Sequence, residues 1–148
     1  PGYRRRQGLV YRRNDARFAG LAPTAAVARA LADPDCAMVN RNTGSGTRAL
    51  IDGLLGPLLD PGRPPGYWVQ ARSHNAVAAA ITQGRADWGV AIATVAAAYG
   101  LGFTALADER YDFVVPVVRR DRPAVAAFER ALADPALRAL LAARGFPA

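Results

Sequence analysis

Short apolar runs alternate along the chain with longer Ala-rich runs, and Gly, Pro, Asn and Asp residues separate them. The apolar runs predict strands and the Ala-rich runs predict helices. Strands are predicted at residues 7–13, 36–40, 67–71, 87–92, 103–106 and 111–118, and helices at residues 25–32, 47–55, 74–83, 94–99, 124–133 and 136–143. The charged residues 108–112 are interpreted as a turn between the last two strands.

This order predicts an α/β fold. Strands that are separated by helices need crossover connections, so the sheet should be largely parallel and covered by helices on both faces. Ligands of such sheets bind beyond the carboxyl ends of the strands, where helix N-termini point. The loops after Asn40, Ala71 and Ile92 are therefore the places to look for a site.

Composition narrows the class of protein. The chain has 148 residues, of which 51% are hydrophobic and 21% are charged, which suits one folded domain and excludes a disordered tail. Apolar runs stay well short of the ~20 residues that cross a bilayer, so no membrane contact is expected. All nineteen cationic side chains are Arg, and beyond three short blocks they are scattered, which indicates a solvated surface more than a nucleic-acid face.

Metal and cofactor chemistry finds little support in the sequence. The only cysteine, Cys36, allows neither an intrachain disulfide nor a cysteine zinc site, and the only histidine is His74. We expect no metal, no cofactor and no catalytic residue. The first residues carry no apolar signal-peptide core, so the expected compartment is the cytoplasm, or the periplasm if an upstream signal was removed.

The strongest candidate site is the loop that follows Asn40. Two glycines let backbone amides approach a ligand, hydroxyl groups add donors, and the following helix presents unpaired N–H groups and a partial positive charge. The arrangement suits an oxyanion, although an ordinary capped loop gives the same pattern. The candidate residues are Thr43, Gly44, Ser45, Gly46 and Thr47.

Two further helix starts are expected on the same edge of the sheet. Ser73 and His74 open one helix, and Thr94 opens another. Three such starts together favour a polar-ligand or anion cleft, while each alone is compatible with a simple N-cap. No nucleophile with an adjacent carboxylate is evident around His74, so we interpret this histidine as a polar residue near a helix cap.

Five motifs, in the same order along the chain, resemble one known family. They are RRQGL at 5–9, NRNTGSGTR at 40–48, SHNAVAAA at 73–80, GRADWG at 84–89 and LADERYD at 106–112. The stretches resemble the PBP-like domain related to type 2 periplasmic binding proteins, which occurs fused to molybdopterin-biosynthesis proteins and to ModE-like helix-turn-helix regulators. The last helices also resemble those of oxyanion-binding transport receptors.

The resemblance implies mainly the second lobe of a two-lobed receptor. Residues 1–13 would be the outward hinge strand, 14–105 the ligand-binding lobe, 106–118 the return hinge strand and 119–148 the C-terminal helices, with the upstream first-lobe segment absent. Molybdate or tungstate is the implied ligand. Thr43, Ser45, Gly46 and Thr47 would contact it, Ser73 and His74 would lie near the second loop, and Tyr111 would offer a hydroxyl group.

The expected function is non-catalytic binding of a small oxyanion in molybdenum uptake, sensing or cofactor metabolism. One alternative is the effector-binding domain of a transcriptional regulator that binds an organic ligand such as a pterin, with the aromatic ring of Trp68 or Trp88 lining the cleft. Another alternative is a part of a molybdopterin-biosynthesis enzyme. Nucleic acid would be contacted only through an upstream domain. The apolar side of the C-terminal helices predicts self-association, unless these helices fold back on the lobe; it comprises Phe128, Leu132, Leu137, Leu140 and Leu141.

Overall fold

The structure, a computed structural model, describes residues 2–56 and 62–147. The chain forms two compact units. Residues 6–107 make the larger unit, and residues 1–5 together with 108–148 make the smaller unit. Within the described residues, no helix combines the length and the apolar character needed to span a membrane.

The described strands form a five-stranded sheet in the order β3-β2-β4-β1-β5. Their bounds are β1 Tyr3–Tyr11, β2 Met38–Arg41, β3 Gln70–Ala71, β4 Trp88–Ile92 and β5 Gly102–Tyr111. β2 pairs in parallel with both β3 and β4, as predicted. β1 departs from that prediction, because it runs antiparallel to β4, with Gln7 opposite Ile92.

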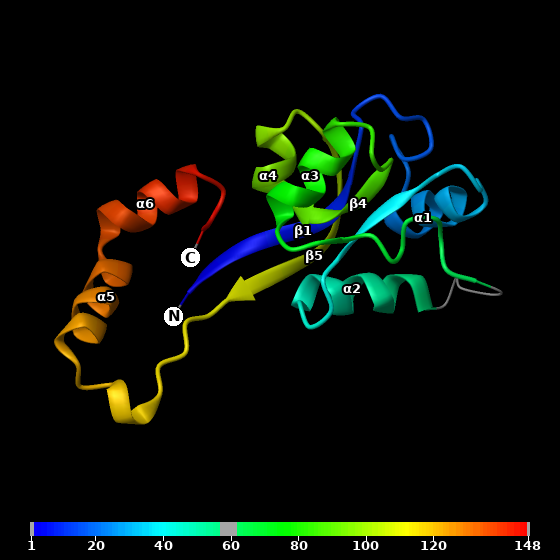
Figure 1. Cartoon of the computed structure of the whole chain (residues 1–148). Coiled ribbons are helices and arrows are strands. Elements are labelled where there is room, and N and C mark those ends of the chain that lie inside the picture. The colour runs from blue at the N-terminus through cyan, green and yellow to red at the C-terminus, as the bar shows by residue number, and fades with distance from the viewer. Residues whose placement is uncertain (1, 57–61, 148) are drawn as a thin grey trace. The chain divides into compact units, whose positions relative to one another are not determined.

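Helices cover both faces of the sheet in the larger unit, which confirms the predicted α/β architecture (Figure 1). The helices are α1 Pro23–Leu31, α2 Gly46–Leu55, α3 His74–Thr82 and α4 Ala93–Ala98. Strand residues alternate between the two faces. Leu9 and Val90 pack with α1 and α2, whereas Val10 and Ala91 pack with α3 and α4. The core therefore consists of two apolar layers.

Two predicted elements in the C-terminal part of the chain, the turn at 108–112 and the strand at 111–118, are wrong. Residues 108–111 are not a turn but the last part of β5, where Glu109 forms an ion pair with Arg5 of β1. The strand predicted at 111–118 does not form; a short 3-10 helix, Val117–Arg119, follows Pro116 instead. Charge pairing across neighbouring strands makes a charged segment compatible with a sheet, and proline lacks the N–H that a strand ladder requires.

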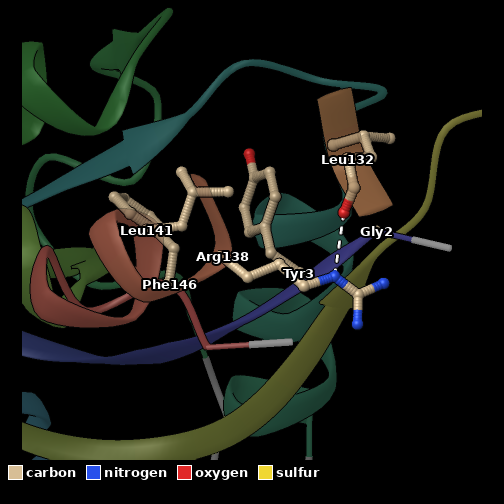
Figure 2. Close-up of a pocket in the computed structure, with 6 residues that line it drawn as sticks. All are labelled: Gly2, Tyr3, Leu132, Arg138, Leu141 and Phe146. Atoms are coloured by element: carbon tan, nitrogen blue, oxygen red, sulfur yellow. Dashed lines mark hydrogen bonds between the residues drawn. The ribbon is translucent and has the colours of Figure 1, made fainter. Parts of the chain in front are cut away.

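The smaller unit contains both predicted C-terminal helices, α5 Pro123–Ala133 and α6 Pro135–Ala143. Asp134 caps α6, since its carboxylate accepts the N–H groups of Ala136 and Leu137 at 2.7 and 3.1 Å. Figure 2 shows the small apolar pocket of this unit, in which Arg138 donates to the Leu132 carbonyl at 2.8 Å. The pocket volume of about 10 Å³ leaves room for little more than one water molecule. Self-association through these helices stays a prediction.

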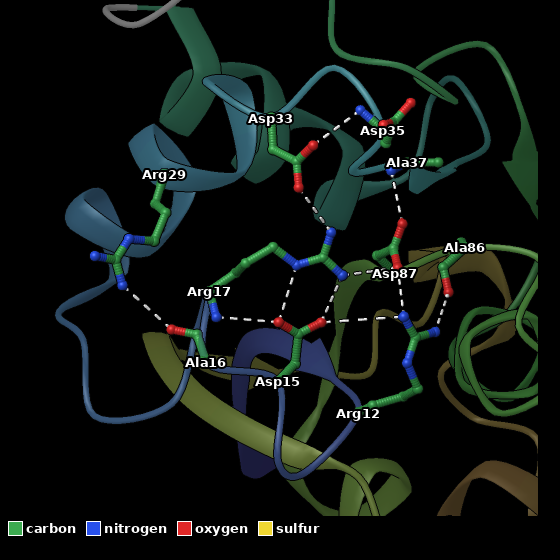
Figure 3. Close-up of polar contacts among 10 residues, drawn as sticks. All are labelled: Arg12, Asp15, Ala16, Arg17, Arg29, Asp33, Asp35, Ala37, Ala86 and Asp87. Carbon is green, nitrogen blue, oxygen red and sulfur yellow. Dashed lines mark hydrogen bonds and ion pairs between the residues drawn. The ribbon is translucent and has the colours of Figure 1, made fainter.

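An ion-pair network joins the loops that precede β2 and β4 to the end of β1 (Figure 3). Asp87 accepts the Ala37 N–H at 2.8 Å and the Arg17 guanidinium at 2.9 Å, and it also pairs with Arg12. Arg17 reaches Asp15 at 2.7 Å as well. Asp87 directly precedes β4, so the network lies at the edge of the sheet opposite the carboxyl ends of β2 and β4.

Gly53 offers a simple test of the helix that starts at the candidate site. It lies in the exposed interior of α2, and a Cβ built on it meets nothing within 4 Å. Gly53→Ala should raise the free energy of unfolding by about 0.5–1 kcal/mol, because glycine loses more backbone entropy in a helix than alanine does. Urea denaturation measures this. A loss of stability would show that α2 does not form as described.

Candidate functional site

The loop between β2 and α2 is held firmly in place. Gly44 has a φ of +85°, a backbone conformation that glycine adopts without steric cost. The Asn42 N–H donates to the Ala71 carbonyl at 3.1 Å, and the Thr43 N–H donates to Gln70 Oε1 at 3.4 Å. Both bonds tie the loop to β3. The loop is thus a fixed support for the first turn of α2.

Ser45 is the N-cap of α2. Its hydroxyl oxygen accepts the Arg48 N–H at 3.1 Å. The first helical residues after an N-cap have N–H groups without an intrahelical partner, and these belong here to Gly46 and Thr47. The positive end of the helix dipole lies at the same place. This helix start has the donors and the partial charge that attract an anion.

A hollow of about 310 Å³ lies beside this helix start. Seven residues line it: Thr43, Gly44, Ser45, Gly46, Arg48, Ala49 and Asp52. Four of the five candidates from the loop are therefore brought together at one hollow. Thr47 does not line it, because its side chain is buried beneath. Its backbone N–H remains part of the helix start.

Arg48, Asp52 and Tyr67 form a cluster at the wall of the hollow. Arg48 is buried, and its Nε donates to both carboxylate oxygens of Asp52 at 2.9 Å. Its Nη2 donates to the Tyr67 hydroxyl at 2.6 Å, and that hydroxyl donates to Asp52 Oδ1 at 2.8 Å. Burial alone would lower the pKa of Arg48, but the hydrogen bonds with Asp52 and Tyr67 outweigh burial and raise it.

Arg48 is the last residue of the NRNTGSGTR motif, and no role was expected for it from the sequence. The signal that could have found the pair is the spacing, because Arg48 and Asp52 are four residues apart on a helix. Tyr67 had no such signal. It comes from the turn before β3, 15 residues beyond Asp52 in the chain.

The second predicted loop lies next to the first, since Arg41 of β2 pairs with Ala71 of β3. Ser73 caps α3 by accepting the Ala76 N–H at 3.1 Å. The buried Arg41 guanidinium donates to the Ala71 carbonyl at 3.2 Å and contacts Nδ1 of His74 at 3.2 Å. A guanidinium has no acceptor, so the histidine nitrogen accepts. Ser73 and His74 do not line the hollow.

Buried polar atoms without a hydrogen-bond partner gather at this edge of the sheet. Within the part of the chain that the structure describes, they include Asn42 Oδ1, Thr94 Oγ1 and Gln7 Oε1. Thr94 lies in the first turn of α4 and Gln7 lies opposite Ile92, so both lie at the carboxyl end of β4. An unpaired buried polar atom costs about 1–3 kcal/mol, and such atoms are typical of sites that a ligand or water completes. No role was expected for Gln7 from the sequence.

The aromatic residues that were predicted to take part in ligand binding do not line the hollow. Tyr111 belongs to the smaller unit, where it stacks on Tyr3 with ring centroids 5.2 Å apart and lies under the Arg5 guanidinium. Its contact with a ligand stays a prediction. Trp88 is fully buried in the core, so the idea that its ring lines the cleft is wrong. Trp68 is 74% exposed.

The two remaining candidates for chemistry are clusters of metal-ligating side chains and the thiol of Cys36. Among residues 2–56 and 62–147, no group of three or more His, Cys, Asp or Glu side chains is arranged to hold a metal ion. Cys36 is buried in the core, and burial raises the pKa of its thiol to about 12. The thiol is therefore neutral at physiological pH, as expected for a small buried apolar side chain.

A mixed sheet with helices on both faces and donor-rich loops at the carboxyl ends of its parallel strands has the layout in which open α/β sheets bind ligands. Comparison with known families gives the class of protein. The family model described as PBP superfamily domain matches residues 1–133, and the chain belongs to this family.

Individual relatives support the fold. The uncharacterized protein YvgK of Bacillus subtilis (strain 168) is 38% identical over 82 residues, which are 55% of this chain and 27% of that protein. The crystal structure of AncCDT-1, an ancestral amino acid-binding protein and precursor of cyclohexadienyl dehydratase, is similar with a TM-score of 0.63 at 14% identity, over 96% of this chain and 58% of that one.

Two further solved structures have the same fold. The periplasmic binding protein XoxJ from Methylobacterium extorquens AM1 has a TM-score of 0.56 at 17% identity, over 98% of this chain and 69% of that chain. PstS from Borrelia burgdorferi has a TM-score of 0.52 at 10% identity, over 99% and 70%. The chain thus spans 58% of AncCDT-1 and 27% of YvgK.

Proposed function

We propose that the hollow at the start of α2 binds a small oxyanion, with molybdate or tungstate as the first candidates, and that the domain is non-catalytic. Its role would be in molybdenum uptake, sensing or cofactor metabolism. The observation that carries this proposal is the hollow itself, where Thr43, Gly44, Ser45 and Gly46 surround the N-terminus of α2. Helix N-termini with glycine-rich loops bind tetrahedral anions.

The nature of the donors supports a non-catalytic role. Backbone N–H and hydroxyl groups stabilise the charge of an oxyanion without transferring a proton to it. The cationic residue that lines the hollow, Arg48, is already paired with Asp52. A ligand would therefore be held chiefly by uncharged donors.

The second candidate is a small organic anion, which one observation favours. Trp68 is largely exposed and its ring contacts Tyr67 edge-to-face, with centroids 4.9 Å apart. Tyr67 in turn touches Asp52 at the wall of the hollow. Neither ring lines the hollow, so a planar ligand with an anionic group would gain ring contacts with Trp68 only where it extends beyond the hollow. The relative AncCDT-1 is described as an amino acid-binding protein.

Titration calorimetry with molybdate, tungstate, sulfate and phosphate tests the proposal on the full chain, with benzoate as an organic anion and glycine as a zwitterionic amino acid. Binding of at least one oxyanion is expected. Thr43→Val should weaken it by about three- to tenfold, since it removes one hydroxyl donor. The matched control is Thr24→Val at the exposed start of α1, which should leave affinity unchanged. Silence with all oxyanions, or equal losses in both variants, would contradict the proposal.

A further inference from the structure

The feature that the proposed function does not explain is an acidic residue in an anion hollow. Asp52 lines the same hollow as the α2 N-terminus, and 42% of its side chain is exposed. A bare carboxylate there would repel an oxyanion. Its presence calls for a role that is compatible with anion binding.

We propose that Asp52 sets the affinity of the hollow by neutralising Arg48, so that the ligand meets no net side-chain charge. This inference rests on the proposed function. Arg48 and Asp52 both line the hollow, and the bonds from Arg48 Nε to the two carboxylate oxygens join them. Asp52 is in this sense an affinity-tuning residue that acts through Arg48.

Tyr67 keeps the pair in this arrangement. Its hydroxyl accepts from Arg48 and donates to Asp52, and its ring lies under the guanidinium at 4.5 Å. The carbonyl of Arg41 accepts a further bond from Arg48 at 3.3 Å. Because three contacts besides Asp52 fix the guanidinium, replacing the carboxylate by an amide leaves Arg48 beside the hollow. Its charge is then no longer balanced.

Removal of the carboxylate charge should strengthen anion binding in proportion to the charge of the anion. Asp52→Asn adds one positive charge to the wall of the hollow. The Coulomb energy is proportional to the product of the charges, so a dianion should gain twice the free energy that a monoanion gains. Molybdate and perrhenate are tetrahedral oxyanions that carry two charges and one charge, respectively. They provide a pair matched in shape.

Titration calorimetry on the full chain measures the effect for both anions in the wild type, Asp52→Asn, Arg48→Gln and the double variant. Asp52→Asn should bind molybdate about tenfold more tightly and perrhenate about threefold more tightly at low salt. Both gains should shrink as salt is added. Arg48→Gln should weaken both anions, and the double variant should return close to wild-type affinity.

Two controls separate this role from other effects. Asp35→Asn makes the same change of net charge at an exposed site in the loop before β2, and it should leave affinity unchanged. Circular dichroism checks that each variant is folded, and Asp52→Ser replaces Asp52→Asn if the latter is not. Equal gains for the two anions, or no gain in a folded variant, would overturn the role of Asp52 while leaving the proposed function intact. No binding by the wild type and by Asp52→Asn would overturn both.

Discussion

Asp87→Ala should lower the free energy of unfolding of the larger unit by about 3 kcal/mol, because it removes one partner of a mostly buried ion-pair network. Asp87 accepts from Arg17, Arg12 and the Ala37 N–H, and only 16% of its side chain is exposed. Its loss leaves two guanidinium groups without this carboxylate and one backbone N–H without its acceptor (Figure 3). Urea denaturation at pH 7 measures the change.

The same network makes the larger unit sensitive to acid. Burial alone would raise the pKa of Asp87, but the hydrogen bonds from Arg17, Ala37 and Arg12 outweigh it and lower the pKa. The hydrogen bond with Arg17 is the main cause of the lowered pKa of Asp15. A carboxyl group with a lowered pKa in the folded state stabilises the fold above its unfolded pKa of about 3.9. This stabilisation is lost as the pH falls through the folded value.

Asp87→Asn therefore distinguishes the ionic contribution from simple packing. The wild type should lose stability steeply below about pH 4, whereas the variant should start lower at pH 7 and lose less between pH 5 and pH 2. Asp35→Ala, at an exposed acidic residue of the same loop region, is the control and should change stability little. Parallel pH profiles of the wild type and Asp87→Asn would contradict the assignment.

Local pattern was sufficient to predict most elements of the fold. The predicted helix at 74–83 corresponds to α3, and the predicted strand at 87–92 corresponds to β4. Capping residues such as Ser73 and the glycines of positive φ after α3 and α4, Gly84 and Gly100, carry this information in the sequence itself. Such signals act over a few residues, which is why the bounds of α3 and β4 agree within one position. The bounds of strands without such signals agree less well, since β1 covers Tyr3–Tyr11 instead of 7–13 and β3 covers only Gln70–Ala71 instead of 67–71.

Longer-range features could not be predicted in the same way. The antiparallel direction of β1 depends on a pairing between residues 85 positions apart, Gln7 and Ile92. Local pattern gave no signal for this pairing. Residues 108–112 were interpreted as a turn because they are charged, and the partner that changes this interpretation, Arg5, is 104 positions away. The sheet therefore depends on contacts between residues that are far apart in the sequence, and a local pattern does not reveal these contacts.

One part of the candidate site could be predicted from the local sequence and the other part could not. Its backbone part, the loop around Gly44 and Ser45, is contiguous and was predicted from residue type alone. Its side-chain part is not contiguous. Arg48 and Asp52 share a helix, but Tyr67 reaches them only because a turn before β3 directs it there. That turn links the local sequence to the electrostatics of the hollow.

The turn has the sequence Pro64-Pro65-Gly66-Tyr67, with Pro at its second position and a glycine of positive φ at its third, as in a type II turn. The Tyr67 N–H donates to the Pro64 carbonyl at 3.1 Å, and the Met38 N–H donates to the Pro65 carbonyl at 2.8 Å. A Cβ built on Gly66 would lie 2.0 Å from the carbonyl oxygen of Met38. The glycine is thus required both by its φ of +78° and by the close approach of β2.

Gly66→Ala should consequently destabilise the larger unit by about 2–4 kcal/mol, since it combines a strained φ with a backbone clash. It should also weaken oxyanion binding, because a turn displaced from β2 also displaces β3, to which the Asn42 and Thr43 N–H groups tie the loop before α2. Urea denaturation and titration calorimetry measure the two effects. Gly62→Ala is the matched control, because a Cβ there meets nothing within 4 Å, and it should change neither quantity appreciably. A folded Gly66→Ala variant with wild-type stability would show that the turn does not approach β2 as described.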